Sequence, residues 1–395
     1  MVSRLPKSTI HIVACILLAL NLRPALAAIG PLLDRIESSA GLTHTEASLL
    51  TALPVIVMGL CALLGRRLRN YFGERRGIGL GMAFVMIACI GRLELTGKAG
   101  LIATALIAGI GIALVQVLLP AFIKRQFASK AGRVMGLYTT GIMAGAAIAA
   151  ASAAGLAREL DWPLTLAVWA LPALVGLLFW FASTTDLTGV EPATGPVSAS
   201  HRPAFWRNTR AWELLVFFGI GTGAYTLVLA WLPPYYTGFG WSADDAGFLL
   251  GGLTLTEVIA GLAVSAFIGY FPDRRGPLLT VLGFLLAGLL CLLAAPLSLA
   301  LPASLLLGLG IGALFPLSLI VTLDHIEDPA LAGDLAAFVQ GGGYIIAGLM
   351  PLLAGILRDR FSDLSQAWIV MAAGTIVLAV MCLRLSPASY ARLSR

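Results

Sequence analysis

The most regular feature of this sequence is a series of long apolar runs separated by short polar segments. A run of about 20 apolar residues is long enough to cross the roughly 30 Å hydrocarbon core of a bilayer as an α-helix. The pattern therefore predicts an all-α membrane protein with twelve transmembrane helices. The spans are placed at residues 10–33, 46–65, 77–97, 99–122, 134–157 and 164–183, then at 211–236, 246–269, 277–297, 303–323, 335–357 and 367–383.

Composition agrees with this prediction, since 59% of the 395 residues are hydrophobic and only 12% are charged. Soluble globular chains carry about 25% charged residues. The net charge of +6 could suggest a nucleic-acid partner, but the basic residues lie in short clusters between the apolar runs. Such clusters set the orientation of a membrane protein. We therefore expect the protein to lie in a lipid bilayer and to bind no nucleic acid.

The residue types that carry catalysis are not arranged for it. The five cysteines show no CxxC spacing, and the four histidines form no HExxH or similar metal pair. No GxSxG motif is present, and the polar segments are too short to hold a soluble catalytic domain. We therefore expect no enzyme activity, no cofactor and no metal.

The N-terminal run resembles a cleavable signal peptide in one respect, because Ala25-Leu26-Ala27 matches the small-residue pattern of a cleavage site. Arg23-Pro24 would then fall inside the cleavage region, and the apolar stretch continues to Leu33. We therefore expect the first span to be retained.

The distribution of Lys and Arg predicts that both termini are cytoplasmic. Of the 26 basic residues, two lie inside spans (Arg23 and Arg92), and only five fall on the predicted outer side. The other nineteen lie on the predicted inner side, which satisfies the positive-inside rule. The five outer residues are Arg35, Lys98, Arg158, Arg358 and Arg360.

The two halves of the chain repeat each other at a fixed offset. Glu74-Arg75-Arg76-Gly77 recurs as Asp273-Arg274-Arg275-Gly276, and Gly109-Ile110-Gly111-Ile112 recurs as Gly308-Leu309-Gly310-Ile311. Both pairs are 199 residues apart. A parallel duplication of six spans is typical of major facilitator transporters. We therefore predict an N-terminal bundle at 1–183, a cytoplasmic linker at 184–210 and a C-terminal bundle at 211–395.

The loop from Leu68 to Arg76, LRNYFGERR, resembles the signature loop between spans two and three of the major facilitator superfamily. In the usual pattern an Asp stands where Asn70 is, and a basic residue stands where Glu74 is. The resemblance implies a conformational lock in this loop and its repeat. We assign the lock to four residues, with Asp273 carrying more of it than Asn70: Arg75, Arg76, Asp273 and Arg274.

Other segments resemble the cyanate permease branch of that superfamily, which contains cyanate and 2-nitroimidazole transporters. These segments lie in both halves, so that the resemblance covers nearly the whole chain. It implies secondary transport of a small solute across a bacterial inner membrane by a monomer. The segments are NLRP at 21–24, LTALP at 50–54, QVLLPAFIKR at 116–125, AWLP at 230–233 and the long run at 315–348.

Charged residues inside spans are the first candidates for a binding site, because each costs about 2.5–3.5 kcal/mol on insertion scales. Arg23 lies 13 residues into the first span, near the bilayer midplane. A guanidinium there offers a fixed charge and planar donors to a small anion, although a structural ion pair is the alternative. Glu257 is its possible partner or a proton-coupling site. Arg92, nearer a span end, is expected to snorkel to the interface.

Four uncharged polar residues also fall inside spans: Asn21, Gln116, Tyr225 and Gln340. In the resembling fold, the helices that hold the first three line the central cavity. Together with Arg23 they would form a polar pocket for a small anion, although an interhelical hydrogen bond is an equally good role for each.

Uptake of a small, cyanate-like anion, with a co-transported proton as a possible partner, is therefore the leading hypothesis. Efflux of a small organic compound resembling 2-nitroimidazole is the first alternative. A span-five motif of drug exporters is matched at Gly132, Gly141 and Gly145, but Ala146 replaces its proline. A non-transporting membrane sensor is the second alternative. Gly141 and Gly145 themselves are read as close helix packing.

Overall fold

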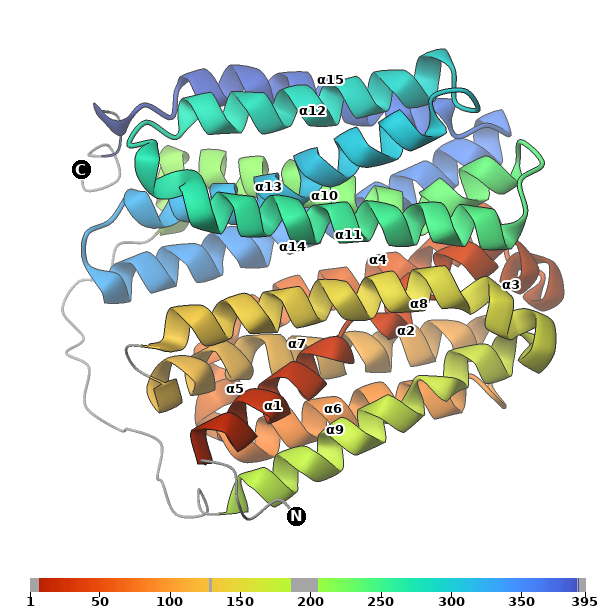
Figure 1. The fold of residues 1–395 in the computed structure, drawn as a ribbon, viewed down its shortest axis with the longest axis horizontal. Helices are drawn as coiled ribbons and strands as arrows, with labels where there is room; N and C mark the ends of the chain where they lie inside the picture. Colours follow the sequence, from red (N-terminus) through yellow and green to blue (C-terminus); the bar gives the residue numbers. More distant parts are fainter. Residues whose placement is uncertain (1–6, 128–129, 186–204, 389, 391–395) are drawn as a thin grey trace.

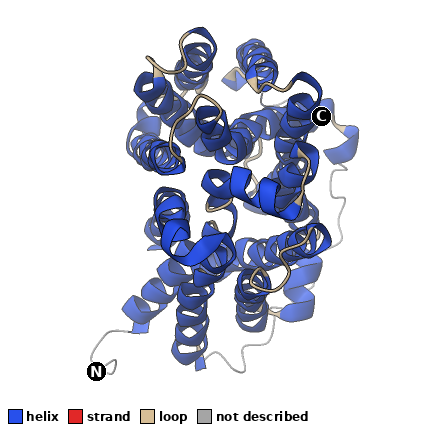
Figure 2. Ribbon diagram, turned by 90° about the vertical axis from the view of Figure 1, so that its right-hand side faces the viewer, coloured by secondary structure: helices blue, strands red, loops and turns tan. Residues whose placement is uncertain are grey.

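The computed structural model describes residues 7–127, 130–185, 205–388 and 390, and within these ranges it contains helices and loops without a strand (Figure 2). The N-terminal half contains α1 (Lys7–Leu20), α2 (Pro24–Ala27), the 3-10 turn η2 (Gly30–Leu32), α3 (Leu33–Ala40), α4 (His44–Leu63), α5 (Gly65–Phe72), α6 (Glu74–Gly91), α7 (Lys98–Phe127), α8 (Ala131–Val168) and α9 (Ala170–Ser183). The C-terminal half contains η5 (Phe205–Arg207), α10 (Thr209–Thr237), α11 (Ala243–Phe267), η6 (Ile268–Tyr270), α12 (Arg275–Ala294), α13 (Ala300–Asp324), α14 (Pro329–Phe361) and α15 (Ser365–Leu383).

Twelve membrane crossings account for these helices. Ten described segments are long and apolar enough to cross a bilayer. One of them, Ala131–Ser183, has 53 residues and reverses at Asp161, where φ is 62°, so that it supplies two crossings. The twelfth is α6, whose 18 residues begin with Glu74 and two arginines. The protein is therefore a multi-pass membrane protein with the all-α fold that the sequence predicts.

Two predicted spans differ from the observed helices. The first span is broken, because α1 ends at Leu20 and α2 begins at Pro24. A proline cannot donate a backbone hydrogen bond to the preceding turn, and it favours the first position of a new helix. The third span, predicted at 77–97, is α6 and ends at Gly91.

The helices form two groups that lie side by side in Figure 1, α1–α9 in one and α10–α15 in the other. The packing repeats at the offset found in the sequence. A Cβ on Gly109 would lie 2.6 Å from Pro54 Cα, and a Cβ on Gly308 would lie 2.7 Å from the Leu253 carbonyl oxygen. Both members of these pairs are 199 residues apart. The exact boundaries of the predicted bundles stay a prediction, since residues 186–204 lie outside the described part.

Ion pairs at corresponding positions repeat in the same way. Glu74 at the start of α6 pairs with Arg125 of α7 at 2.7 Å. In the other half, Arg274 before α12 pairs with Asp324 of α13 at 2.9 Å. Arg125 and Asp324 are again 199 residues apart, whereas Glu74 and Arg274 are 200 residues apart. The pair therefore recurs between the same two helices with the charges reversed and one partner displaced by one residue. The duplication is therefore visible in the packing as well as in the sequence.

The boundary between the halves is formed mainly by α4 against α14 and by α8 against α11 (Figure 1). Glycines allow close contact there. A Cβ on Gly59 would lie 2.5 Å from the Gly341 carbonyl oxygen, and one on Gly247 would lie 2.7 Å from the Ala150 carbonyl oxygen. We call the end of the molecule at which α1 begins and α15 ends the terminal end, and the opposite end, with the α3–α4 and α10–α11 loops, the far end.

Candidate functional site

The break in the first membrane segment places Arg23 at the start of α2, where its side chain is only 5% exposed. Asn21 holds the break in position, because its amide nitrogen donates to the Leu17 carbonyl oxygen (2.7 Å) and to the Pro172 carbonyl oxygen of α9 (3.0 Å). The close helix packing predicted at Gly145 is confirmed, since a Cβ on this residue of α8 would lie 2.1 Å from the Leu20 carbonyl oxygen at the end of α1. Asn21 therefore shapes the site through the backbone.

Arg92 also supports the broken segment, and the expectation that it snorkels to the interface is wrong. Its side chain is 2% exposed, and its Nη1 donates to the Ala25 carbonyl oxygen at 2.9 Å. The break leaves carbonyl groups of α2 without helical partners, and buried carbonyl groups require one. The guanidinium of Arg92 supplies that partner, so its role is structural.

Arg23 itself has no such partner. Within the described ranges its guanidinium makes neither a hydrogen bond nor an ion pair, and its Nε is buried without an acceptor. Its guanidinium carbon lies 5.4 Å from the centroid of the Tyr225 ring on α10. The contact is a cation–π interaction that crosses the boundary between the halves. The charge is thus positioned without being neutralised by a direct contact.

Glu257 provides an opposite charge from the other half. It lies on α11, is 3% exposed, and both of its carboxyl oxygens are buried without a described hydrogen-bond partner. It interacts electrostatically with Arg23 but forms no ion pair with it. Its backbone is tightly enclosed, since a Cβ on Gly312 of α13 would lie 2.3 Å from Glu257 Cα. The predicted association of Arg23 with Glu257 therefore appears as proximity of two separate charges.

The uncharged candidate residues differ in whether they contact Arg23. Tyr225 is brought to Arg23, and its buried hydroxyl is without a partner. Gln116 has a buried amide oxygen without a partner, which leaves it available to a ligand, but no contact joins it to Arg23. Gln340 is half-buried on α14. Their assignments as substrate-binding residues stay predictions.

Three further polar residues belong to this region and were missed in the sequence. Tyr138 on α8 and Tyr344 on α14 are buried and interact electrostatically with Arg23. Thr222 on α10 has a buried hydroxyl without a partner. A tyrosine inside an apolar helix was the available signal, because its hydroxyl requires a partner when buried. Tyr344 lies one helical turn after Gln340 on α14.

The predicted lock residues lie at the terminal end, and their described contacts stay within their own halves. Arg75 donates to the Thr184 hydroxyl at 3.1 Å, while Arg76 is exposed. Asp273 pairs with the neighbouring Arg275 at 2.6 Å, and Arg274 pairs with Asp324 of α13. The role of these four residues in a conformational lock stays a prediction.

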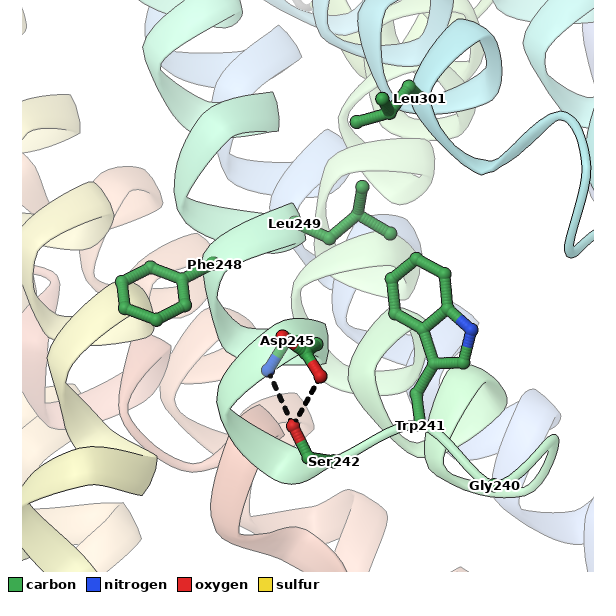
Figure 3. A pocket seen from close by; sticks show the side chains of 7 residues that line it. All are labelled: Gly240, Trp241, Ser242, Asp245, Phe248, Leu249 and Leu301. Carbon is green, nitrogen blue, oxygen red and sulfur yellow. Dashed lines mark hydrogen bonds between the residues drawn. The ribbon is translucent and has the colours of Figure 1, made fainter.

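A surface pocket of about 510 Å³ lies elsewhere, at the far end of the C-terminal half (Figure 3). Its polar group is a helix cap: Ser242 accepts from the Asp245 amide at 3.1 Å and donates to the Asp245 carboxylate at 2.6 Å. These polar atoms satisfy one another, and the remaining walls include Phe248, Leu249 and Leu301. The partnerless polar atoms around Arg23 make that region the better candidate site.

Comparisons with known proteins agree with this arrangement. A model of the Major Facilitator Superfamily matches residues 15–349. The chain is 36% identical over 381 residues to the cyanate transport protein CynX of Escherichia coli (strain K12), with 96% of this chain and 97% of that protein covered. It is 30% identical to the 2-nitroimidazole transporter of the same organism, with 95% and 94% covered. The crystal structure of a D-xylose-proton symporter superposes with a TM-score of 0.77 at 14% identity, with 97% and 99% covered. The chain therefore belongs to the major facilitator superfamily, a family of membrane transporters.

Proposed function

We propose that this protein is a secondary transporter of a small, cyanate-like anion, which it moves by alternating access. The observation that carries the proposal is the buried guanidinium of Arg23, which lacks a carboxylate or hydrogen-bond partner among the described residues. An unpaired charge inside a membrane protein is costly and marks a functional site by default. A planar guanidinium suits a small anion because it offers several donors in a fixed arrangement.

The relatives support this choice of solute. The family resemblance predicted from the sequence is confirmed, and one relative that the chain matches over nearly its whole length is named a cyanate transport protein. Gln116, Thr222 and Tyr225 supply further buried polar atoms without described partners. A few polar groups in an apolar surrounding are typical of a site for a small solute.

The proposed cellular setting is the bacterial inner membrane, with the terminal end facing the cytoplasm and the protein acting as a monomer. The positive-inside count supports this orientation. We expect a reporter enzyme that works only in the cytoplasm to be active when it is fused after Arg395. Activity of a periplasmic reporter at that position would reverse the orientation.

Charge balance leads us to propose proton coupling through Glu257. Moving an anion into a cell that is negative inside costs about 2.3 kcal/mol per 100 mV. A proton carried with the anion removes that cost. Glu257 is the carboxyl group that lies beside Arg23 on the opposite half, with both oxygens free of described partners. Exchange for another anion is the alternative solution.

Efflux of a small organic compound is the second candidate function, and the similarity to a 2-nitroimidazole transporter favours it. The two candidates make different demands on Arg23. A neutral aromatic solute does not require a fixed positive charge, whereas a small anion does. Loss of 2-nitroimidazole transport in an Arg23→Ala variant would therefore be unexpected if that compound were the solute.

The deciding experiment is uptake of labelled cyanate into proteoliposomes, with and without an inwardly directed proton gradient. We expect uptake above that of protein-free liposomes, and a higher accumulated level when the gradient is present. Labelled 2-nitroimidazole is measured in parallel. Transport of 2-nitroimidazole without cyanate uptake would replace the anion proposal with the efflux proposal.

A further inference from the structure

Three buried tyrosines lie around Arg23, and they come from both halves of the molecule. Tyr138 belongs to α8, Tyr225 to α10 and Tyr344 to α14. Their exposed fractions are 4%, 7% and 7%. Each interacts electrostatically with Arg23, and Tyr344 interacts in the same way with both of the other tyrosines. Tyr225 contacts the guanidinium directly, and we call Arg23 and the three tyrosines that interact with it the tyrosine cluster.

The hydroxyls of this cluster are without protein partners. No hydrogen bond joins any of the three to another described residue, and the Tyr225 oxygen is fully buried in that state. Buried tyrosine hydroxyls usually find a hydrogen-bond partner, and a buried polar group without one is costly. The buried Tyr225 hydroxyl without a partner, beside an unpaired guanidinium, indicates that the missing acceptor belongs to a ligand.

Packing holds the Tyr344 ring in place, and a hydrogen bond joins the helices that carry Tyr225 and Tyr344. The Tyr344 ring meets the Phe218 ring edge to face, with centroids 5.5 Å apart. The neighbouring Gly343 lies so close to Phe218 that a Cβ would be 2.4 Å from the ring. Directly after Tyr225, the Thr226 hydroxyl of α10 donates to the Ala347 carbonyl oxygen of α14 at 2.6 Å. A preorganised site loses less free energy on binding than a mobile one.

We propose that the hydroxyls of Tyr138, Tyr225 and Tyr344 are the specificity-determining donors of the anion site, and that they select a linear or planar monoanion with acceptor atoms at both ends. The inference rests on the proposed function and deepens it. Arg23 and Tyr138 come from the N-terminal half, whereas Tyr225 and Tyr344 come from the C-terminal half. An anion with acceptors at both ends accepts hydrogen bonds from both halves at once, whereas a monatomic anion offers no second end.

Anion binding to the purified protein tests this inference without requiring transport. Dissociation constants for cyanate, azide and bromide are obtained from the rise of the thermal-unfolding midpoint with anion concentration at constant ionic strength. Tyr138→Phe, Tyr225→Phe and Tyr344→Phe remove one hydroxyl each and keep the ring. Tyr270→Phe is the matched control, because Tyr270 is 78% exposed. The midpoint without added anion shows whether each variant is folded.

We expect wild-type protein to bind cyanate and azide more tightly than bromide, and each cluster variant to lose about tenfold in affinity for the two linear anions, as for a hydrogen bond to a charged group. The control should bind as the wild type does. Unchanged affinities in all three variants, or equal binding of bromide and azide, would overturn the inference and leave the proposed function standing. Failure of the wild type to bind any of the anions would overturn both. If the wild type binds the linear anions through the tyrosines but shows no cyanate uptake, the inference stands and the proposed function is wrong.

Discussion

Arg23 and Glu257 come from different halves and interact electrostatically, and neither neutralises the other by direct contact. Both could be selected from the sequence, because a charged residue deep inside an apolar run is conspicuous. The absence of a direct ion pair between them could not be predicted from the sequence, since it depends on how the halves pack. Tyr138 and Tyr344 were missed for a related reason: a tyrosine in an apolar helix does not reveal whether its hydroxyl has a partner. The hydrogen bond of Arg92 could not be predicted either, because the Ala25 carbonyl oxygen becomes available as an acceptor only where the helix breaks.

Replacement of Arg23 tests the anion site directly. Arg23→Ala is expected to abolish cyanate uptake into proteoliposomes, and Arg23→Lys to reduce it at least tenfold, because an ammonium lacks the planar arrangement of donors. The variants should remain folded, since the side chain has no hydrogen-bond partner to lose. Arg207→Lys, at an exposed position, serves as the control. Parental uptake rates in Arg23→Ala would exclude Arg23 from the site.

Glu257→Gln separates binding from proton coupling. The amide keeps the size of the side chain but cannot take up and release a proton. We therefore expect anion exchange across the membrane to persist while accumulation driven by a pH gradient is lost. Glu159→Gln, at an exposed position of α8 just before the reversal at Asp161, is the control. Gradient-driven accumulation equal to that of the wild type would remove Glu257 from the mechanism and favour exchange.

His325 predicts how stability depends on pH at the terminal end. Burial lowers the pKa of His325 to about 4, and its Nε2 accepts a hydrogen bond from Arg210 Nε at 3.2 Å. An unfolded histidine has a pKa of about 6.5. As the pH falls from about 6.5 to 4, the unfolded chain binds a proton that the folded chain does not, so the free energy of unfolding decreases. Thermal-unfolding midpoints measured over this range should fall less steeply in His325→Gln than in the wild type. Equal slopes would contradict the prediction.

At the scale of helices, apolar runs predicted the crossings well but not their continuity. The first run is uninterrupted in apolar character, yet Asn21 and Pro24 divide it, and the Asn21 side chain is bonded to α1 and to α9. The Asn-Leu-Arg-Pro segment was a usable signal, because proline and a hydrogen-bonding side chain both disfavour a continuous helix. The contact with α9 that fixes the break is tertiary and has no signature in the local sequence.

Contact between α11 and α13 positions Glu257 and can be tested with one methyl group. A Cβ on Gly312 would lie 2.3 Å from both Cα and the carbonyl oxygen of Glu257. Because backbone atoms cannot move aside cheaply, Gly312→Ala should destabilise the protein by about 1–3 kcal/mol, as overpacking does. Gly283→Ala is the matched control, since a Cβ on that glycine of α12 meets nothing within 4 Å. Thermal unfolding in detergent checks both variants. An undiminished midpoint for Gly312→Ala would show that α11 and α13 pack less closely than described.

At the scale of the whole molecule, the duplication was the strongest prediction from the sequence, and the packing bears it out. Gly109 against Pro54 and Gly308 against Leu253 repeat one helix–helix contact at the 199-residue offset. What the sequence does not show is the set of contacts between the halves, because these join segments that are distant along the chain. At the far end Arg158 pairs with Asp244 at 3.3 Å, and the Thr237 hydroxyl donates to Asp34. These contacts hold the two halves together there.

Asp359 joins α14 to the first turn of α4 at the far end (Figure 1). Its carboxylate accepts from the backbone amides of His44 (3.0 Å) and Thr45 (2.9 Å) and from the Thr45 hydroxyl (2.6 Å). The first amides of a helix lack partners within the helix, so a carboxylate from the opposite half satisfies them and the helix dipole favours its charge. These bonds exist only while the far end is closed. The proposed alternating access requires them to break, so we expect Asp359 to influence the equilibrium between the two states.

Asp359→Asn is therefore expected to shift this equilibrium toward a state that is open at the far end. The amide group keeps one acceptor but loses the charge, so that the two backbone amides and the hydroxyl can no longer all be satisfied equally well. Spin labels at Ser38 and Phe239, in a protein whose five cysteines have been replaced, report the distance between the halves at this end. The fraction of molecules at the longer distance should rise in Asp359→Asn. Asp363→Asn should leave the distribution unchanged, because Asp363 accepts a bond from Ser365 within its own half. If Asp359→Asn gives the same distribution as the wild type, the bonds to α4 do not control opening, and the other contacts between Asp34, Thr237, Arg158 and Asp244 are sufficient to keep the far end closed.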